Sequence, residues 1–252
     1  MNLLGHNYIA YKVLKETTPY TLVGSHIPDF VPFLPTSIFK FEEIHENQEK
    51  FLDFVKEKYP DATSLPLSMM CHSVKYGADK YNREIDTWLL EDKEDLAGEV
   101  SRMIVDSSGV SFETARGPRL HNYLWCGADL YLMKNNPDSV IDKFVTSLES
   151  IDYNYTSKIL SEFYKKDKKL VKENLLDHFK FITPETFKDI EAFVKFWSKF
   201  LSPLKEGDNL DTKKGTELLN FIYTEFENDW EKIIGKVESK VKVSMKPFIT
   251  QE

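Results

Sequence analysis

The protein has 252 residues, a formal net charge of −8, and 41% hydrophobic and 13% aromatic residues. This composition is typical of a globular protein and excludes extended disorder. The negative charge argues against a broad nucleic-acid-binding surface, because phosphate contacts need concentrated Lys and Arg. It does not exclude a nuclease whose bound cations supply positive charge locally.

The sequence contains no apolar run of about 18 residues, so no transmembrane segment is expected. The first residues lack the basic region and the long apolar stretch of a secretory signal. Two cysteines, Cys71 and Cys126, cannot form a disulfide framework and are expected as small buried side chains. We therefore expect a reduced, cytoplasmic protein.

Glycine and proline are few, at 10 and 11 residues, and they cluster at breaks. This distribution favours helices over the frequent turns of an all-β protein. We predict an all-α fold, a multi-helix bundle with a metal site between the amino-terminal helices and a helical carboxy-terminal extension. The expected division is a metal-site region over 1–136 and a helical region over 137–252, packed together as one compact unit.

The first helix is predicted from Leu3 to Lys15. Residues 17–38 contain four prolines and are expected to form a long ordered loop with one short turn. A helix over 41–58 should stop at Pro60, and the next should run from 64 through His72 to about 91, with a bend allowed at Gly77. The other expected helices are bounded by glycine, asparagine or proline and cover 93–106, 118–135, 138–149, 153–165, 168–181, 184–202 and 212–235.

The histidines are distributed unevenly, with five of the six before residue 122. Dispersed His and Asp residues on separate helices, gathered by folding, are typical of helical metal hydrolases. The candidate metal ligands are His6, Asp29, His45, His72, Asp79, His121 and Asp129. His26 is expected either as a ligand or as a brace for its loop, and His178 as an ordinary packed residue.

The spacing of two candidate pairs limits how they can bind metal. His72 and Asp79 are seven residues apart, which on one straight helix separates them by about 10 Å along the axis. This distance is long for a single ion, although a bend at Gly77 would shorten it. Two neighbouring ions, or one direct ligand and one outer group, fit better. The pair His121 and Asp129 has the same difficulty.

Five short segments resemble the helical zinc-dependent phospholipase C family, whose architecture is shared with the P1/S1-type nucleases. These segments cover about residues 1–133 and are His6-Asn7-x-x-Ala10, Gly24-x-x-Ile27-Pro28-Asp29, Ile44-His45-Glu46, His72-x6-Asp79 and His121-Asn122. The resemblance implies an all-α protein that holds up to three metal ions and cleaves phosphoester bonds with a metal-activated water. By resemblance, His6 and Asp29 serve one ion, His45 and His72 with a carboxylate serve a second, and His121 serves a third or shared site.

The sequence departs from the family at two positions. The family's His-x3-Asp and His-x3-Glu pairs appear here as His72-x3-Tyr76 and His121-x3-Trp125. Between one and three Zn²⁺ ions are therefore expected, with one or two favoured, and Mn²⁺ or iron can occupy the same ligands.

The leading hypothesis is a metal-dependent phosphoester hydrolase, either phospholipase C-like or a phosphodiesterase, acting on a small phosphoester or a phospholipid. Asp29 is the candidate catalytic residue that positions or deprotonates the water. Lys75, Arg116 and Arg119 are candidates for binding the substrate phosphate. The alternative is a catalytically inactive helical scaffold or partner-binding protein whose polar cluster is structural.

Overall fold

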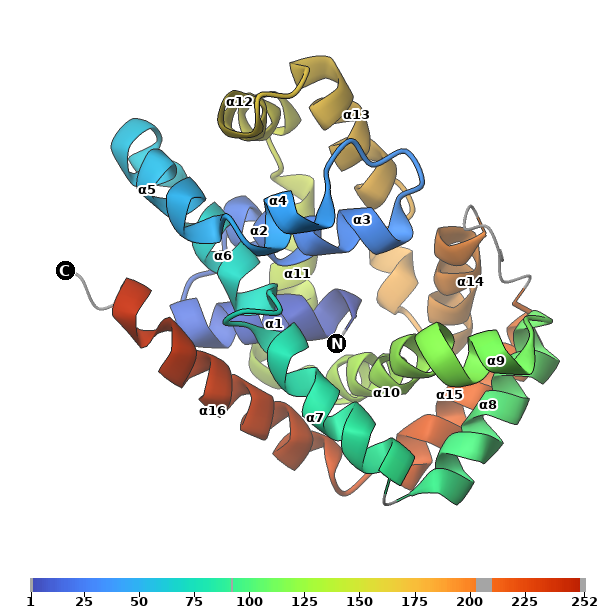
Figure 1. The fold of residues 1–252 in the computed structure, drawn as a ribbon. Coiled ribbons are helices and arrows are strands. Elements are labelled where there is room, and N and C mark those ends of the chain that lie inside the picture. The colour runs from blue at the N-terminus through green and yellow to red at the C-terminus, as the bar shows by residue number, and fades with distance from the viewer. Residues whose placement is uncertain (1, 92, 203–209, 250–252) are drawn as a thin grey trace. The chain divides into compact units, whose positions relative to one another are not determined.

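The computed structural model describes residues 2–91, 93–202 and 210–249, and of residues 84, 85 and 87–90 it describes the backbone alone. In these ranges the regular elements are helices and no strand occurs, which confirms the predicted all-α, multi-helix fold (Figure 1). None of the helices in the described ranges is both long and apolar enough for a membrane span.

The chain divides into two compact units, each assembled from segments that are far apart in the sequence. Unit 1 consists of Met1–Gly5, Tyr81–Ile141 and Phe181–Lys236, and unit 2 consists of His6–Lys80, Asp142–Lys180 and Val237–Glu252. The division expected between residues 136 and 137 does not coincide with these boundaries. Each unit instead takes residues from both sides of that point.

Unit 2 contains the helices of the amino-terminal segment and a helical pair from the middle of the chain. Their bounds are α1 (Leu3–Leu14, in this unit from His6), α2 (Pro19–His26), η1 (Ile27–Asp29), α3 (Phe30–Phe33), α4 (Phe41–His45), α5 (Gln48–Lys58), η2 (Pro60–Ala62), α6 (Ser64–His72), α12 (Tyr153–Tyr164) and α13 (Lys168–Phe179). Within this unit α2 packs along α6, and α12 lies beside α13 (Figure 1).

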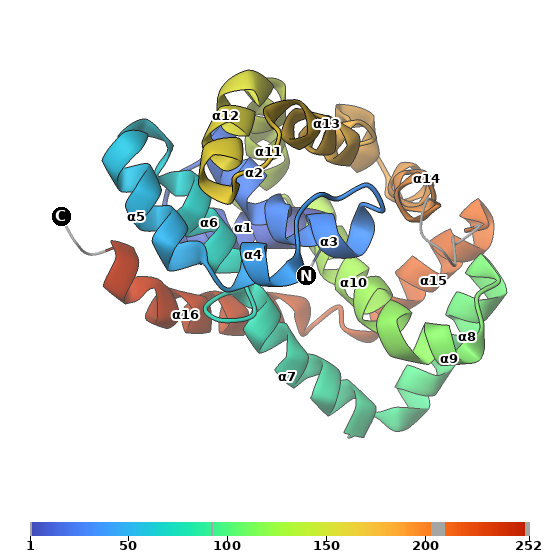
Figure 2. The same cartoon turned by 45° about the horizontal axis from the view of Figure 1, so that its top comes forward.

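Unit 1 is built mainly from α8, α10, α14 and α15. The bounds of its elements are α8 (Glu94–Ser108), α9 (Phe112–Thr114), the π-helical turn η3 (Ala115–Arg119), α10 (Leu120–Asn135), η4 (Pro137–Ser139), η5 (Pro184–Phe187), α14 (Ile190–Leu201) and α15 (Thr212–Glu225). Helix α15 packs against α8, α10 and α14. Figure 2 shows α15 beside α8. The unit boundaries fall within α1, α7 (Ala78–Glu91), α11 (Val140–Glu149) and α16 (Trp230–Ile249).

The expected loop over 17–38 is wrong, because most of this segment is helical. Pro19 occupies the first turn of α2, where proline is tolerated since its missing N–H would have no partner within the helix. Thr18 caps the same helix by accepting a hydrogen bond from the N–H of Thr21 at 3.1 Å. Pro28 similarly lies in the first turn of η1. Prolines here begin helices rather than prevent them.

Three predicted helices are each divided in two. The helix expected over 41–58 breaks after His45 and gives α4 and α5, and the helix expected over 64–91 ends at His72 and resumes as α7. The helix expected over 212–235 ends at Glu225, and α16 begins at Trp230. The apolar periodicity continues across these breaks, so the sequence pattern does not reveal them.

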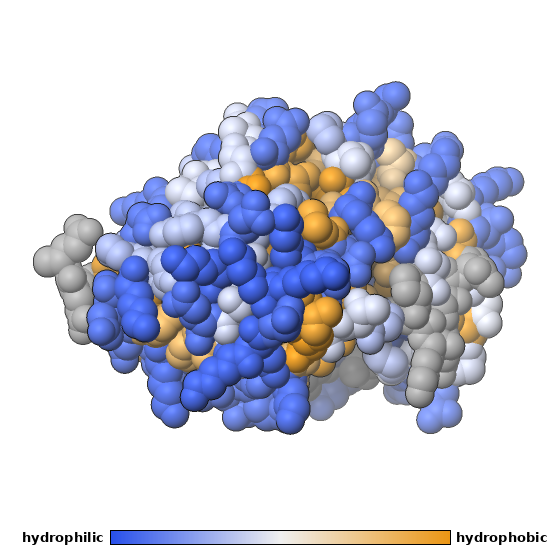
Figure 3. Space-filling model, turned by 90° about the horizontal axis from the view of Figure 1, so that it is seen from above, coloured by the Kyte–Doolittle hydropathy of each residue, from blue (hydrophilic) through white to orange (hydrophobic). Residues whose placement is uncertain are grey.

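The surface is largely polar on the face shown in Figure 3, where hydrophobic residues form separate small patches among hydrophilic ones. The exposed large hydrophobic side chains in the described ranges are Phe41, Phe112, Leu170, Leu176 and Val243.

Candidate metal centre

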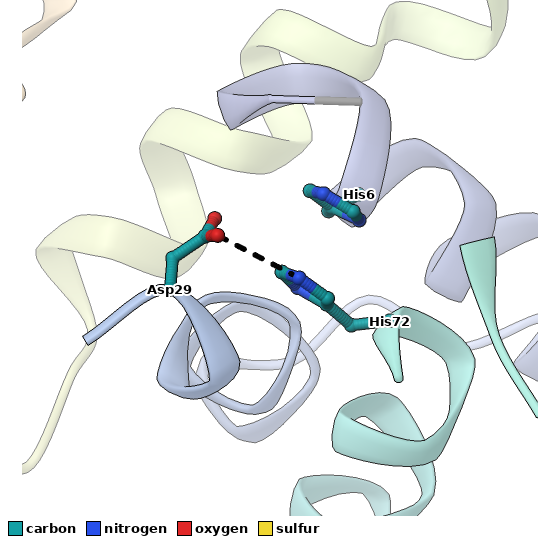
Figure 4. A group of neighbouring side chains, drawn as sticks. All are labelled: His6, Asp29 and His72. Carbon is teal, nitrogen blue, oxygen red and sulfur yellow. Dashed lines mark ion pairs between the residues drawn. The ribbon is translucent and has the colours of Figure 1, made fainter. Parts of the chain in front are cut away.

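Three of the predicted ligands meet in unit 2. A nitrogen atom of His6, a nitrogen atom of His72 and a carboxylate oxygen of Asp29 all lie within 4.8 Å of one another. They come from α1, from the last residue of α6 and from η1. In Figure 4 the Asp29 carboxylate points toward the two imidazoles, with His6 and His72 side by side. Both histidines are buried, whereas Asp29 retains 19% exposure of its side chain.

Asp79 reaches the same group because a tight loop at residues 73–77 separates α6 from α7. Ser73 has a ψ of 160°, which ends α6, and the N–H of Gly77 donates to the carbonyl of Ser73 at 2.9 Å. A Cβ atom on Gly77 would lie 2.3 Å from the carbonyl oxygen of Cys71, so this close backbone contact requires glycine. The separation of about 10 Å expected for one straight helix is therefore wrong. The bend allowed at Gly77 is confirmed as a complete turn.

The two carboxylate oxygens of Asp79 face different imidazoles. Oδ2 lies 3.2 Å from Nε2 of His72, and Oδ1 lies 3.6 Å from Nε2 of His6. Oδ1 of Asp29 is 3.7 Å from the same His72 nitrogen. Two ligand atoms each about 2.1 Å from a tetrahedral ion are about 3.4 Å apart. The observed separations bracket that value, so these side chains fit the ligand spacing of a small divalent cation.

The orientation of the His72 ring is fixed by a backbone contact. Its Nδ1 lies 2.6 Å from the carbonyl oxygen of Ser25, an atom that only accepts hydrogen bonds, so Nδ1 carries a proton and donates it. The second nitrogen, Nε2, is buried and faces the carboxylates of Asp29 and Asp79. A proton or a cation must lie at Nε2, because a neutral imidazole would direct its lone pair at two anions. This is the arrangement in which metal-binding histidines are held.

The charge states of these groups follow from their surroundings. Burial alone would lower the pKa of His72, but the neighbouring Asp79 and Asp29 outweigh it and the pKa is raised. For His6, burial and the adjacent His72 hold the pKa well below its usual value, so this imidazole is neutral. Burial opposes ionisation of Asp79, yet His72 and His6 more than offset it and lower the pKa of Asp79. Neutral imidazole and ionised carboxylate are the forms that bind metal, so His6 and Asp79 are in these forms, whereas the raised pKa of His72 means that its Nε2 must give up a proton to a bound cation.

His6 and His72 also stack on each other. Their ring centroids are 3.5 Å apart and the ring planes differ by 3°. Nδ1 of His6 is buried and has no hydrogen-bond partner within the described part of the chain. An unpaired buried polar atom costs about 1–3 kcal/mol. Nε2 of the same ring is the atom that faces Asp79, so a cation bound beside Asp79 would leave Nδ1 without a partner.

His45 lies next to this group without being one of its three members. It is buried at the end of α4, and its ring centroid is 6.2 Å from that of His72. Its other face stacks on Phe41 at a centroid distance of 4.1 Å. His45 is therefore a neighbour of the candidate centre, and its role as a direct ligand stays a prediction.

His26 and His178 form a buried pair in unit 2. Nδ1 of His26 lies 3.2 Å from Nε2 of His178, and both residues are almost completely buried. Burial lowers the pKa of His178 to about 3, so this ring is neutral. The contact joins the end of α2 to α13 and favours the bracing role expected for His26. No sequence signal indicated that His178, more than 150 residues away, would be its partner.

His121 and Asp129 belong to unit 1, where each has a different partner. Nδ1 of His121 contacts Oδ2 of Asp86 at 2.6 Å, and Asp86 was not among the predicted residues. Asp129 is fully buried, and its Oδ1 accepts a hydrogen bond from the N–H of Gly5 at 2.9 Å, at the start of α1. Its carboxyl group therefore satisfies an N–H at the start of α1 that has no partner within the helix. The structure does not bring these two residues into one group with each other.

The predicted phosphate-binding cations have acidic partners or are buried. Nζ of Lys75 lies 2.5 Å from Oε1 of Glu49, and Arg116 pairs with Glu94 at 3.2 Å. Arg119 is buried in unit 1, with 8% of its surface exposed. Their roles toward a substrate stay predictions.

No family model, no curated protein and no solved structure matches this chain. The geometry of the site itself therefore carries the functional argument. Besides Asp86 and His178, the sequence did not indicate the carbonyl of Ser25 as a partner of His72, because a backbone acceptor has no signature in the side-chain pattern.

Proposed function

We propose that unit 2 binds a divalent cation, Zn²⁺ in the first instance, through His72, His6, Asp79 and Asp29. The observation that carries this proposal is the fixed His72 ring, with Nδ1 held by the Ser25 carbonyl and Nε2 directed at two carboxylates. The nitrogen and oxygen donors suit Zn²⁺, and the same set accepts Mn²⁺ or iron.

We propose that the protein uses this centre to hydrolyse phosphoester bonds. A bound divalent cation supplies a water of lowered pKa and polarises a phosphoryl oxygen. Asp29 would accept the proton of that water, since its side chain keeps 19% exposure and can pass the proton on to solvent. His72 and Asp79 would hold the centre rigid. The resemblance of five segments to the zinc-dependent phospholipase C family supports the reaction class, and a small phosphoester or phospholipid is the proposed substrate.

Metal content tests the first half of the proposal. Protein purified without chelator should contain at least one Zn²⁺, Mn²⁺ or iron per chain, and His72→Ala should lose it. His121→Ala is the matched control, because His121 pairs with Asp86 in unit 1. Loss of metal from both variants to the same extent would contradict the assignment to unit 2.

Hydrolysis of bis-p-nitrophenyl phosphate tests the second half. The metal-loaded wild-type protein should turn over this diester. Asp29→Asn, assayed with Zn²⁺ added to saturation because Asp29 is also a proposed ligand, should reduce the rate at least about 100-fold, as expected when a general base is removed. If the metal-loaded protein hydrolyses neither phosphate monoesters nor diesters, the hydrolase proposal is wrong and the protein is a metal-binding scaffold. A wild-type protein without metal would favour the second candidate, a helical scaffold, which the pairing of Lys75 and Arg116 with glutamates also favours.

A further inference from the structure

A line of polar contacts runs along the interface of α2 and α6 and ends at His72. Oγ1 of Thr18 lies 3.1 Å from Oγ of Ser64, and one turn further Oγ of Ser68 donates to the carbonyl of Thr21 at 2.6 Å. The next turn brings the contact of His72 with the carbonyl of Ser25, also at 2.6 Å. We call these three contacts the polar seam.

The seam has a regular spacing that locks the register of the two helices. Its α6 residues, Ser64, Ser68 and His72, are each four apart and therefore share one face of the helix. The two bonds to backbone carbonyls both join residues that are 47 apart in the chain, so α2 and α6 run in the same direction. Sliding one helix along the other would break both buried bonds together.

The close approach of the helices depends on Gly24. A Cβ atom at this position would lie 2.2 Å from the carbonyl oxygen of Leu65 and 2.9 Å from Cβ of Ser68. The first of these atoms is backbone and cannot rotate away, so any side chain at residue 24 must push α2 from α6. Asn7 of α1 adds a contact to Oγ of Ser25 at 3.5 Å, on the residue whose carbonyl holds His72.

We infer that Gly24 and the polar seam are positioning elements that present Nε2 of His72 to the metal, with Nδ1 committed to the Ser25 carbonyl. This inference rests on the proposed metal site in unit 2. His72 has two ring nitrogens, and without the seam either one could be protonated and either could bind. Loss of such an outer contact costs metal affinity by about 10–100-fold.

The experiment compares two variants that add a methyl group at the polar seam, called the wedge variants, with two matched controls. Gly24→Ala inserts a methyl group against Leu65, and Ser68→Thr keeps the hydroxyl but adds a methyl at the same interface. Gly235→Ala is the control for the first, because a Cβ on this helical glycine meets no heavy atom within 4 Å. Ser101→Thr is the control for the second, because Ser101 is a fully buried helical serine in unit 1. Alanine favours helix over glycine by about 1 kcal/mol, so helix propensity cannot explain a loss in Gly24→Ala.

Two quantities are measured on each protein. Long-range ¹H–¹⁵N spectra of the histidine rings in the metal-free protein report the hydrogen-bonded Nδ1 proton of His72. Competition with a chromophoric chelator reports the Zn²⁺ dissociation constant. Both wedge variants should shift or abolish the Nδ1 proton signal and weaken Zn²⁺ binding about 10–100-fold, whereas both controls should match the wild type.

Each outcome decides the inference. If Gly24→Ala and Ser68→Thr keep the wild-type Nδ1 signal and the wild-type affinity, the seam does not position His72 and the inference is overturned. If Gly24→Ala does not fold, Ser68→Thr alone decides. Weakened binding with an unchanged Nδ1 signal also overturns it. Absence of Zn²⁺ binding in the wild type removes the proposed function and the ligand role, while the Nδ1 signal still shows whether the seam fixes the ring.

Discussion

Replacing Asp129 with asparagine should change how the stability of the protein depends on pH. Asp129 is fully buried in unit 1, and burial raises the pKa of its carboxyl from 3.8 to about 7 against the opposing hydrogen bond from the N–H of Gly5. Its Oδ2 is buried and has no hydrogen-bond partner in the described ranges, which favours the protonated acid. Asparagine keeps a carbonyl oxygen for the Gly5 N–H but does not titrate.

The size of the effect follows from the two pKa values. Between 3.8 and about 7 the folded protein holds a proton that the unfolded chain has released, so the free energy of unfolding falls as the pH rises through this window. The contribution of Asp129 to the free energy of unfolding is fully present below the pKa of the unfolded chain and is lost as the pH rises above the pKa of the folded protein. At about 1.4 kcal/mol per pH unit, the wild type should lose up to about 4 kcal/mol relative to Asp129→Asn across the window.

Urea denaturation at a series of pH values measures this difference directly. The wild-type free energy of unfolding minus that of Asp129→Asn should decline steadily from about pH 4 to about pH 7 and then level off. Zn²⁺ affinity serves as a second readout and should be unchanged, because asparagine keeps an acceptor oxygen for the N–H of Gly5, the residue before His6. A difference that stays constant over the whole pH range would refute the reasoning.

Three further predictions concern close packing and buried groups. Gly77→Ala should destabilise the protein by about 1–3 kcal/mol, because its Cβ would lie 2.3 Å from the Cys71 carbonyl oxygen. It should also weaken Zn²⁺ binding, because Asp79 lies two residues further along the chain; denaturation and chelator competition measure the two effects, and unchanged binding would contradict the role of the turn. Gly127→Ala should destabilise unit 1 by a similar amount without affecting Zn²⁺ binding, since its Cβ would lie 2.5 Å from the Trp230 ring; a melting temperature equal to that of Gly235→Ala would argue against this. Cys71 and Cys126 should not react with a thiol reagent until the protein unfolds, because both are fully buried and burial raises the pKa of each thiol; rapid labelling of the native protein would be inconsistent with that burial.

The sequence was informative about helices and about which residues gather in unit 2. Composition and apolar periodicity predicted the all-α fold, and the first helix, expected over Leu3–Lys15, ends within one residue of the prediction. His6, Asp29 and His72 were all named as ligands from their residue types and order, and they do lie together. These three residues could be predicted from the sequence because only a few residue types serve as metal ligands.

The breaks between helices were not accessible in the same way. The tight loop after His72 depends on the backbone conformation of Ser73 and on the close approach of Gly77 to the Cys71 carbonyl, and neither is visible in a pattern of apolar side chains. The same holds for the prolines of α2 and η1: Thr18 caps α2 ahead of Pro19, whereas η1 begins around Pro28 without a side-chain cap.

The partners of the remaining candidates depend on contacts distant in sequence. His121 binds Asp86, and His26 binds His178, over separations of 35 and 152 residues. Residue type and local spacing cannot choose among so many carboxylates and imidazoles. The sequence thus predicted which side chains gather in one group but not the partners of the other candidates.

All four donors of the candidate centre come from residues 6–79, whereas unit 2 also needs Asp142–Lys180 and Val237–Glu252. During synthesis the imidazoles and carboxylates therefore leave the ribosome well before the helices that complete their surroundings. Histidines of the unfolded chain also bind metals. Metal binding would therefore stabilise the native state by less than the affinity of the folded site suggests.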